Sequence, residues 1–287
     1  MPTMGALHAG HEALIRRARE LADVAGGAGG AIPGAGAVVV SIFVNPVQFN
    51  EASDFEAYPR TLERDVEVCR GLGADVVFAP SVGGMYPEGV EAGEAHRSRS
   101  GLVKANPGIP GEVPGLPGVA AEPGLEDRCR PGHFAGVCRV CRRLFALVGP
   151  RAAVFGEKDW QQLQVIRAMV AMDGLGIEIV GHPTVREADG LAMSSRNARL
   201  SASERERAGA VPRALEAACA EHEPGRAEAA GRRVLDEAGV ETEYFAVRDA
   251  ETLMEWQAGR PGRLLAAARV GTTRLIDNMA WLPRPRK

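Results

Sequence analysis

The sequence of 287 residues contains very little lysine. Lys104, Lys158 and Lys287 are its only lysines, so arginine supplies almost all of the positive charge. The net charge is only −3, which excludes the broad basic field that binds nucleic acid or an acidic membrane surface. We therefore expect small molecules as partners and no nucleic acid.

Long apolar runs are also missing. No stretch approaches the roughly 18 to 20 apolar residues that cross a bilayer, and the N-terminal residues lack the basic segment and apolar core of a secretory signal. These absences predict a cytoplasmic protein without a membrane partner.

Cysteine is scarce, and its odd number argues against a disulfide framework. Cys138 and Cys141 do form a C-x-x-C motif, which is compatible with a redox or zinc site. The apolar residues around them recur at helical spacing, and no second pair of ligands accompanies them. We therefore favour the interpretation that both cysteines are small buried side chains of a helix.

The first two thirds of the chain alternate between predicted helices and strands. Residues 37–44, AVVVSIFV, form an unbroken β-branched run typical of a buried strand. Helices are expected at residues 12–24, 61–72, 135–148 and 159–172, and further strands at residues 75–79, 152–155 and 177–181. This alternation predicts an α/β fold, with a doubly wound, Rossmann-like parallel sheet in an N-terminal domain over residues 1–184.

Residues 185–287 have a different character and predict a smaller α+β C-terminal domain. Two alanine- and arginine-rich helices, at residues 203–221 and 226–238, precede strands at 243–247, 263–270 and 273–277. Two stretches rich in glycine or proline, residues 26–36 and 100–128, are expected to be disordered insertions.

The first polar cluster is LHAGH, residues 7–11. Ligands of an open parallel sheet bind where strands end and helices begin, and a helix N-terminus favours phosphate. His8 and His11 can donate to phosphate oxygens, and Gly10 lets a ligand approach the backbone. The alternative is that the two histidines cap the helix or bind an adventitious metal ion.

Two further clusters follow predicted strands. In SIFVNPVQFN, the amides of Asn45 and Gln48 suit a carboxylate or hydroxyl of a small substrate, although an Asn-Pro turn explains the same residues. In FGEKDWQQL, Lys158 stands near a helix start, where a compact cation can contact phosphate. A solvated surface lysine is the alternative.

The fourth cluster, PTVREADGLAMSSRNARLS, lies where the two predicted domains meet. Ser194, Ser195 and Arg196 together offer hydroxyls, N–H groups and a guanidinium, which suit a polyphosphate held between domains. The tripeptide alone is too short to carry information.

Taken together, the clusters resemble the pantothenate synthetase (pantoate–β-alanine ligase) family of the nucleotidyltransferase superfamily, whose signature is H-x-G-H. The matching segments are PTMGALHAGH, SIFVNPVQF, DFEAYPRTLERD, RPGHFAGV, FGEKDWQQLQVIR, PTVREADGLAMSSRNARLS and LLAAARVGTTRLIDN. The resemblance covers nearly the whole chain outside the two stretches rich in glycine or proline.

This resemblance implies an ATP-dependent ligation in two steps at one site. Pantoate first attacks the α-phosphorus of ATP to give pantoyl adenylate and pyrophosphate, and the amine of β-alanine then displaces AMP to give pantothenate. The protein would act mainly by positioning and charge stabilisation. Family likeness also implies a homodimer, Mg²⁺ carried on the ATP phosphates, and a C-terminal domain that closes over the ATP site.

The site residues implied by the resemblance fall into three groups. His8, His11, Lys158, Ser194, Ser195 and Arg196 would act on the ATP phosphates and be catalytic; Met4, Gly10, Gly156, Asp159, Val185 and Met193 would complete the ATP site; Gln48, Gln162, Asn45, Met4, Arg130 and His133 would bind substrate. Within the last group, Gln48 and Gln162 would hold pantoate, and Asn45 would lie near β-alanine. Asp65 is a candidate carboxylate near the magnesium ion.

The start of the chain departs from the family pattern, which has a strand leading into PTMG. The sequence begins at Met1 with Pro2 next, so we expect the first strand to be missing or nearly so. Its loss would expose the edges of neighbouring strands and remove buried contacts. The missing strand raises one alternative, an inactive or weakly active nucleotide-binding relative. A separate alternative among enzymes is another adenylyl transferase of the same superfamily that uses a different acid.

Overall fold

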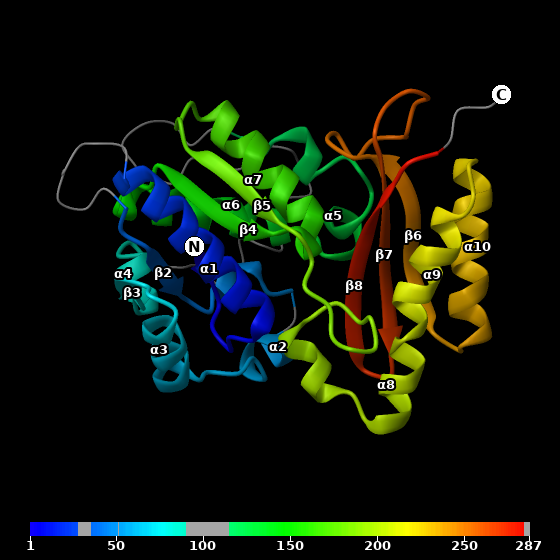
Figure 1. Ribbon diagram of the computed structural model, residues 1–287, viewed down its shortest axis with the longest axis horizontal. Coiled ribbons are helices and arrows are strands. Elements are labelled where there is room, and N and C mark those ends of the chain that lie inside the picture. Colours follow the sequence, from blue (N-terminus) through cyan, green and yellow to red (C-terminus); the bar gives the residue numbers. More distant parts are fainter. Residues whose placement is uncertain (28–35, 51, 90–114, 284–287) are drawn as a thin grey trace. The chain divides into compact units, whose positions relative to one another are not determined.

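The computed structural model describes residues 1–27, 36–50, 52–89 and 115–283 (Figure 1). They form two compact units. The first contains Met1–Glu157 and Val165–His182, and the second contains Lys158–Gln164 and Pro183–Lys287. Residues 28–35 and 100–114 of the two predicted insertions lie outside the described residues.

Parallel strands make up the sheets of the first unit. β1 (Pro2–Thr3), β2 (Val39–Ile42) and β3 (Val76–Phe78) pair in the order β1-β2-β3, and β4 (Ala152–Gly156) pairs with β5 (Glu178–His182). β1 also lies against β4. The predicted parallel α/β class is confirmed.

β1 is a strand of only two residues, as expected from the start of the sequence. Its pairing nevertheless extends along β2, because the Met1 carbonyl accepts from the Ser41 N–H and the Thr3 carbonyl accepts from the Phe43 N–H, both at 3.0 Å. The expectation of an exposed edge on this side of β2 is therefore wrong.

Helices α1 (Ala9–Gly27) and α3 (Leu62–Gly71) share a buried core with β2. Ile15 of α1 and Cys69 of α3 pack with Val40 of the strand, and all three are completely buried. α1 begins three residues before the predicted helix, so the histidine motif forms its first turn. The unit also contains α6 (His133–Val148) and shares α7 (Trp160–Met172) with the second unit.

Several short elements between residues 46 and 159 were not predicted. They are α2 (Ala52–Glu56), α4 (Val82–Met85), α5 (Glu126–Cys129), and the 3₁₀ turns η1 (Pro46–Gln48), η3 (Gly118–Ala120) and η4 (Glu157–Asp159). The expected disorder of residues 115–128 is wrong, because η3 and α5 lie there and bury Ala120 and Leu125.

The second unit is built on an antiparallel sheet. β6 (Glu241–Asp249), β7 (Gly262–Val270) and β8 (Thr273–Trp281) pair in that order, which places β8 at an edge. α9 (Ala210–Cys219) and α10 (Pro224–Glu237) contribute to one core with the sheet.

One predicted helix of the second unit is divided. Residues 203–221 form α8 (Ala202–Ala208) and α9, with Gly209 between them. A capping box of Ser201 and Glu204 begins α8. η5 (Ser195–Arg199) precedes it and lies against β8.

Cys138 and Cys141 lie inside α6 as free, buried thiols. Burial raises the pKa of Cys138 to about 12 and that of Cys141 further, which keeps both thiols protonated. The interpretation as small buried side chains is confirmed.

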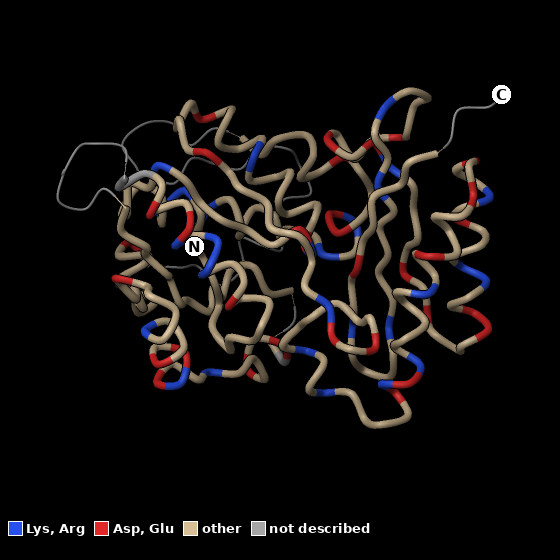
Figure 2. The backbone as a smooth tube through the Cα atoms, viewed as in Figure 1, with Lys and Arg blue, Asp and Glu red and all other residues tan. Residues whose placement is uncertain are grey.

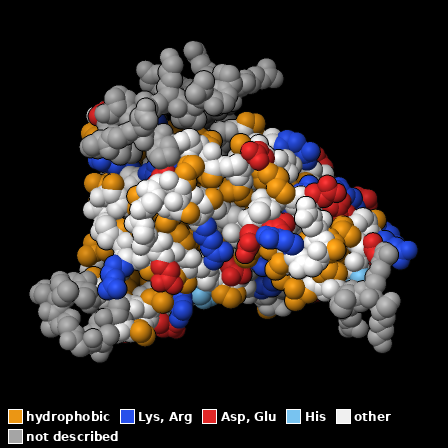
Figure 3. All heavy atoms as spheres, turned by 90° about the horizontal axis from the view of Figure 1, so that it is seen from above, with side chains coloured by type: hydrophobic (Ala, Val, Ile, Leu, Met, Phe, Trp, Pro, Cys, Tyr) orange, Lys and Arg blue, Asp and Glu red, His pale blue; other side chains and the backbone are white. Residues whose placement is uncertain are grey.

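Charges of both signs are interleaved along the backbone and on the face seen from above (Figures 2 and 3). Within the described ranges, each helix is too short or too polar to cross a membrane.

Candidate functional site

The loop between β1 and α1 is held in place by one buried carboxylate. Asp65 of α3 is 1% exposed, and its two oxygens accept the backbone N–H groups of Ala6 and Leu7, each at 2.9 Å. Gly5 and Ala6 both have positive φ, at 82° and 51°. Asp65 thus fixes a sharp turn directly before the histidine motif.

The two histidines cap α1 with one ring nitrogen each. Nδ1 of His8 accepts from the Gly10 N–H at 3.2 Å, and Nδ1 of His11 accepts from the His8 N–H at 3.4 Å. Since a backbone N–H can only donate, neither Nδ1 carries a proton, and each ring proton is on Nε2. The Nε2–H of each ring therefore belongs to the positive end of a 19-residue helix.

Buried hydrogen bonds orient the amide of Gln48. The Asn45 Nδ2 donates to Gln48 Oε1 and to the Gly136 carbonyl, both at 3.1 Å, while Tyr86 Oη donates to Asn45 Oδ1 at 2.9 Å. Gln48 Nε2 in turn donates to the Met4 sulfur at 2.8 Å. Asn45 is 1% exposed, and its Nδ2 and Oδ1 both make buried hydrogen bonds, so its side chain fixes the amide of Gln48.

The RPGHF segment supports the backbone of the same residue. His133 Nδ1 lies 2.8 Å from the Gln48 carbonyl, and Arg130 Nη1 lies 3.2 Å from His133 Nε2. A carbonyl only accepts and a guanidinium only donates, so the proton of His133 is on Nδ1. Arg130 and His133 thus hold Gln48 from its main-chain side.

Tyr86 and Gly136 were missed by the sequence reasoning. Burial raises the pKa of Tyr86, so its hydroxyl remains a donor, and the Arg139 guanidinium lies 4.7 Å from its ring centroid. A Cβ on Gly136 would lie 2.5 Å from the Val47 carbonyl oxygen. A glycine within an apolar helical pattern signals such a close approach, whereas the tyrosine carries no local signal.

Most of the other candidates belong to the second unit. Lys158 and Asp159 lie in η4, where Nζ and Oδ1 are 3.7 Å apart, and Gln162 is half-buried in the first turn of α7. Gly156 ends β4 in the first unit, where a Cβ would lie 3.8 Å from Leu14 of α1.

A hairpin brings Val185 and Met193 together, since the Met193 N–H donates to the Val185 carbonyl at 2.9 Å. Directly after it, Ser194 caps η5, and its hydroxyl accepts from the Arg196 N–H at 3.2 Å. The Ser194–Arg196 cluster therefore follows a fixed turn.

No group of three or more His, Cys, Asp or Glu side chains that could hold a metal ion occurs among the residues described. Asp65, the predicted carboxylate near magnesium, already accepts from two backbone groups and from the Thr61 hydroxyl at 3.1 Å. This geometry favours a role in fixing the histidine loop.

Comparison with known proteins identifies the family. The family model described as pantoate-beta-alanine ligase matches residues 1–280. The chain belongs to the pantoate–β-alanine ligase family. Pantothenate synthetases of a Nocardioides species and of Mycolicibacterium smegmatis are 47% and 46% identical, with 97% and 98% of this chain aligned to 77% and 79% of those relatives.

Solved structures of pantoate–β-alanine ligases are similar to this chain as well. Pantothenate synthetase from Thermus thermophilus has a TM-score of 0.79 at 41% identity, covering 98% of this chain and 92% of that chain. A Francisella tularensis pantoate–β-alanine ligase, solved with β,γ ATP and β-alanine, has a TM-score of 0.70 at 30% identity, covering 97% and 87%.

The chain is thus an enzyme that joins pantoate to β-alanine at the expense of ATP. The predicted ligase function is confirmed, and family membership disfavours both an inactive relative and a transferase for a different acid.

Proposed function

We propose that the ligation proceeds through pantoyl adenylate, with His8 and His11 as the donors that stabilise the transition state. The observation that carries this proposal is that Nδ1 of each ring accepts a backbone N–H at the start of α1, which places the ring proton on Nε2. As pantoate attacks the α-phosphorus, negative charge grows on the phosphate oxygens, and preorganised donors lower the barrier most at that stage. Gly10 leaves the backbone beside them open to the ligand.

Gln48 and Gln162 bind the pantoate hydroxyls and carboxylate in this proposal. The second Nε2 hydrogen of Gln48 suits either acceptor, and the Met4 sulfur lies beside the same amide. Asn45 was predicted to lie near β-alanine, and its engaged amide supports an indirect role through Gln48. Arg130 and His133 support the same residue from its carbonyl side.

Lys158, Ser194, Ser195 and Arg196 bind the ATP phosphates, and Gly156, Asp159, Val185 and Met193 shape the nucleotide pocket. A cation, two hydroxyls and a guanidinium match the chemistry of the leaving pyrophosphate. The C-terminal domain, predicted over residues 185–287, closes over the nucleotide and excludes water from the adenylate.

Magnesium enters as part of the substrate. No group of three or more His, Cys, Asp or Glu side chains that could hold the ion occurs among the described residues, and Asp65 already accepts from two backbone donors. Phosphate oxygens are preferred ligands of Mg²⁺, so MgATP is the bound species.

A coupled assay tests the proposal. The protein with MgATP and pantoate, without β-alanine, should release one pyrophosphate per site and retain pantoyl adenylate; β-alanine should then release AMP. Absence of pyrophosphate release from folded protein until β-alanine is added would contradict the adenylate route.

We also propose that the enzyme is a cytoplasmic homodimer, as the family resemblance implies. Analytical ultracentrifugation should give twice the 30.4 kDa mass of the chain. A single species at the monomer mass would refute the dimer.

A further inference from the structure

Two adjacent residues of β8, Asp277 and Asn278, are polar and buried, with 2% and 3% exposure. Consecutive residues of a strand point to opposite faces of a sheet. The two side chains therefore contact different neighbours. Both belong to the LLAAARVGTTRLIDN segment, none of whose residues has a role in the proposed ligation.

Asp277 holds the hairpin that leads into the Ser194–Arg196 cluster. Its carboxylate accepts two hydrogen bonds from Arg186, at 2.7 and 3.0 Å. Arg186 bridges to Ala192 across the hairpin and donates to the Gly190 carbonyl at 3.0 Å. The hydrogen bond from Arg186 to Asp277 raises the pKa of the guanidinium, which keeps Arg186 charged.

Asn278 holds the backbone of Lys158. Its Nδ2 donates to the Lys158 carbonyl at 2.8 Å, and its Oδ1 accepts from Arg263 Nε at 2.7 Å. The guanidinium of Arg263 also lies 3.6 Å from the centroid of the Trp160 ring. One donor bond and one acceptor bond fix the orientation of the Asn278 amide.

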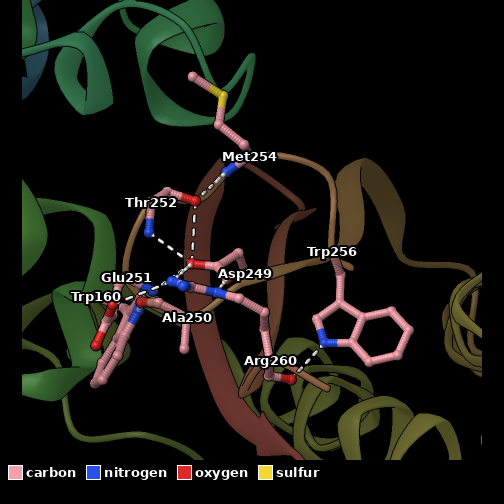
Figure 4. A network of polar contacts seen from close by, with 8 residues as sticks. All are labelled: Trp160, Asp249, Ala250, Glu251, Thr252, Met254, Trp256 and Arg260. Carbon is pink, nitrogen blue, oxygen red and sulfur yellow. Dashed lines mark hydrogen bonds and ion pairs between the residues drawn. The ribbon is translucent and has the colours of Figure 1, made fainter. Parts of the chain in front are cut away.

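Trp160 anchors the same segment from its other side. Its indole N–H donates to the Ala250 carbonyl at 2.8 Å, next to a loop stapled by Asp249 (Figure 4). Asp249 accepts from the Thr252 N–H at 2.8 Å and from Arg260 Nε at 2.6 Å. The backbone that carries the Lys158 side chain is therefore held at two points. Asn278 holds the Lys158 carbonyl, and the hydrogen bond to Ala250 holds Trp160, two residues further along the chain.

We infer that Asp277 and Asn278 are positioning residues for phosphate binding: Asn278 acts through Lys158, and Asp277 acts through the hairpin before Ser194–Arg196. This inference rests on the proposed phosphate roles of Lys158 and that cluster. A phosphate-binding side chain that is misplaced by about 1 Å can lower the rate by about 100-fold. Because Asp277 and Asn278 are adjacent on β8, one strand positions both Lys158 and the Ser194–Arg196 cluster.

Single variants with a matched control test the inference. Asn278→Ala and Asp277→Asn should each lower pantoate-dependent pyrophosphate release by about 100-fold. Release of AMP from supplied pantoyl adenylate and β-alanine should keep the parent rate, because that step involves no β- or γ-phosphate. Glu243→Gln removes a carboxylate that accepts from Arg269 and Arg274 on the same sheet, and it should leave both steps unchanged.

An equal loss in both steps would show general distortion and overturn the inference. If Asp277→Asn does not fold, Arg186→Gln removes the same ion pair from its more exposed partner, whose side chain is 27% exposed. The same loss of the first step alone is expected.

Double variants separate the two routes. When Lys158 is already alanine, Asn278→Ala should cause no further loss of pyrophosphate release, whereas Asp277→Asn should keep its full effect. When Arg196 is already alanine, Asp277→Asn should cause no further loss, whereas Asn278→Ala should keep its full effect. Residues that act through one group are non-additive, and independent structural effects add. Additive losses in all four combinations would overturn the inference.

The single variants Lys158→Ala and Arg196→Ala distinguish a failure of this inference from a failure of the proposed phosphate roles. If Lys158→Ala and Arg196→Ala impair pyrophosphate release but the β8 variants do not, the inference fails and the proposed phosphate roles stand. If Lys158→Ala and Arg196→Ala are themselves without effect, both fail.

Discussion

At the scale of single residues, the histidine motif shows that capping and catalysis can use different atoms of one side chain. The sequence left two interpretations of His8 and His11, as helix caps or as phosphate contacts. The Nδ1 atoms do cap α1, and this fixes the proton on Nε2 of each ring. The capping bonds thus preorganise the donors that the proposed chemistry needs.

Replacing His11 tests that role. His11→Ala should lower kcat by about 100-fold, on the order of 3 kcal/mol, because one preorganised donor is lost. His11→Gln should retain more activity than His11→Asn, since a glutamine amide reaches the position of Nε2 and an asparagine amide reaches that of Nδ1. Steady-state kinetics at saturating substrates measures both comparisons.

The control is His222→Ala, which removes an exposed histidine between α9 and α10. It should match the parent enzyme. A His11→Ala variant with a raised KM for ATP but an unchanged kcat would refute the transition-state role.

Tyr86 allows a second test at this scale. Tyr86→Phe leaves the buried Asn45 Oδ1 without its donor, which should cost about 1–3 kcal/mol of folding free energy. The Asn45 amide can then rotate, so Gln48 loses its fixed orientation and the KM for pantoate should rise. Denaturant unfolding and pantoate titrations measure the two effects.

Tyr244→Phe, at a buried tyrosine of β6, serves as the comparison. It should leave the KM for pantoate unchanged even if stability falls. An unchanged KM in Tyr86→Phe would show that the orientation of Gln48 does not depend on the tyrosine.

At the scale of elements, the site depends on how closely α6 approaches η1. Gly136 permits this approach, because any side chain there would meet the main chain of Val47 and Gln48. Main-chain atoms cannot move away as a flexible side chain can. The helix and the turn must therefore separate if the glycine is replaced.

Gly136→Ala should destabilise the protein by about 1–3 kcal/mol, the usual cost of overpacking, and should raise the KM for pantoate by displacing Gln48. Gly225→Ala in α10 is the matched control, because a Cβ there meets nothing within 4 Å. It should be neutral or stabilise by up to about 1 kcal/mol. Thermal unfolding that ranks the two variants equally would contradict the packing argument.

The long elements could be predicted from sequence because their pattern is local. The β-branched run of β2 and the apolar spacing of α6 both predicted the right structure. η1, α4 and the ordered residues 115–128 were missed, since they are too short to show a period and are stabilised by contacts distant in sequence. The division at Gly209 was missed because the residues on both sides favour helix.

In the candidate site, too, short motifs could be recognised from the sequence, whereas contacts between residues distant in sequence could not. Local motifs indicated His8, Gln48 and Lys158 as candidate ligand contacts. The hydrogen bonds from Tyr86 to Asn45 and from Asn278 to Lys158 join residues 41 and 120 positions apart, and no local pattern encodes them. Sequence therefore indicated the candidate ligand-binding groups, whose roles stay predictions, but it did not indicate the residues that hold them in place.

At the scale of the whole molecule, acid stability depends on carboxylates that the fold keeps ionised. Burial opposes ionisation of Asp249, yet hydrogen bonds from Arg260, Thr252 and Glu251 hold its pKa well below the ordinary 3.8. Hydrogen bonds from Arg205 likewise lower the pKa values of Glu187 and Asp189. All of these groups belong to the second unit.

The sign of the pH effect follows from the direction of these shifts. A carboxyl with a lower pKa in the folded state contributes its full stability above its unfolded value and loses it as the pH falls toward the folded value. For Asp249 that loss begins near pH 3.8 and continues downward. The midpoint of urea unfolding should therefore fall steeply below about pH 4.

Asp249→Asn should flatten this dependence, because the substituted side chain cannot ionise and contributes equally at every pH. Its unfolding midpoint should lie below that of the parent at pH 7 and approach it as the pH falls toward 2. Asp236→Asn, at an exposed carboxylate in α10, should keep the slope of the parent. If the unfolding midpoint of Asp249→Asn instead changes with pH in parallel with that of the parent, the ionisation of Asp249 does not determine the loss of stability in acid.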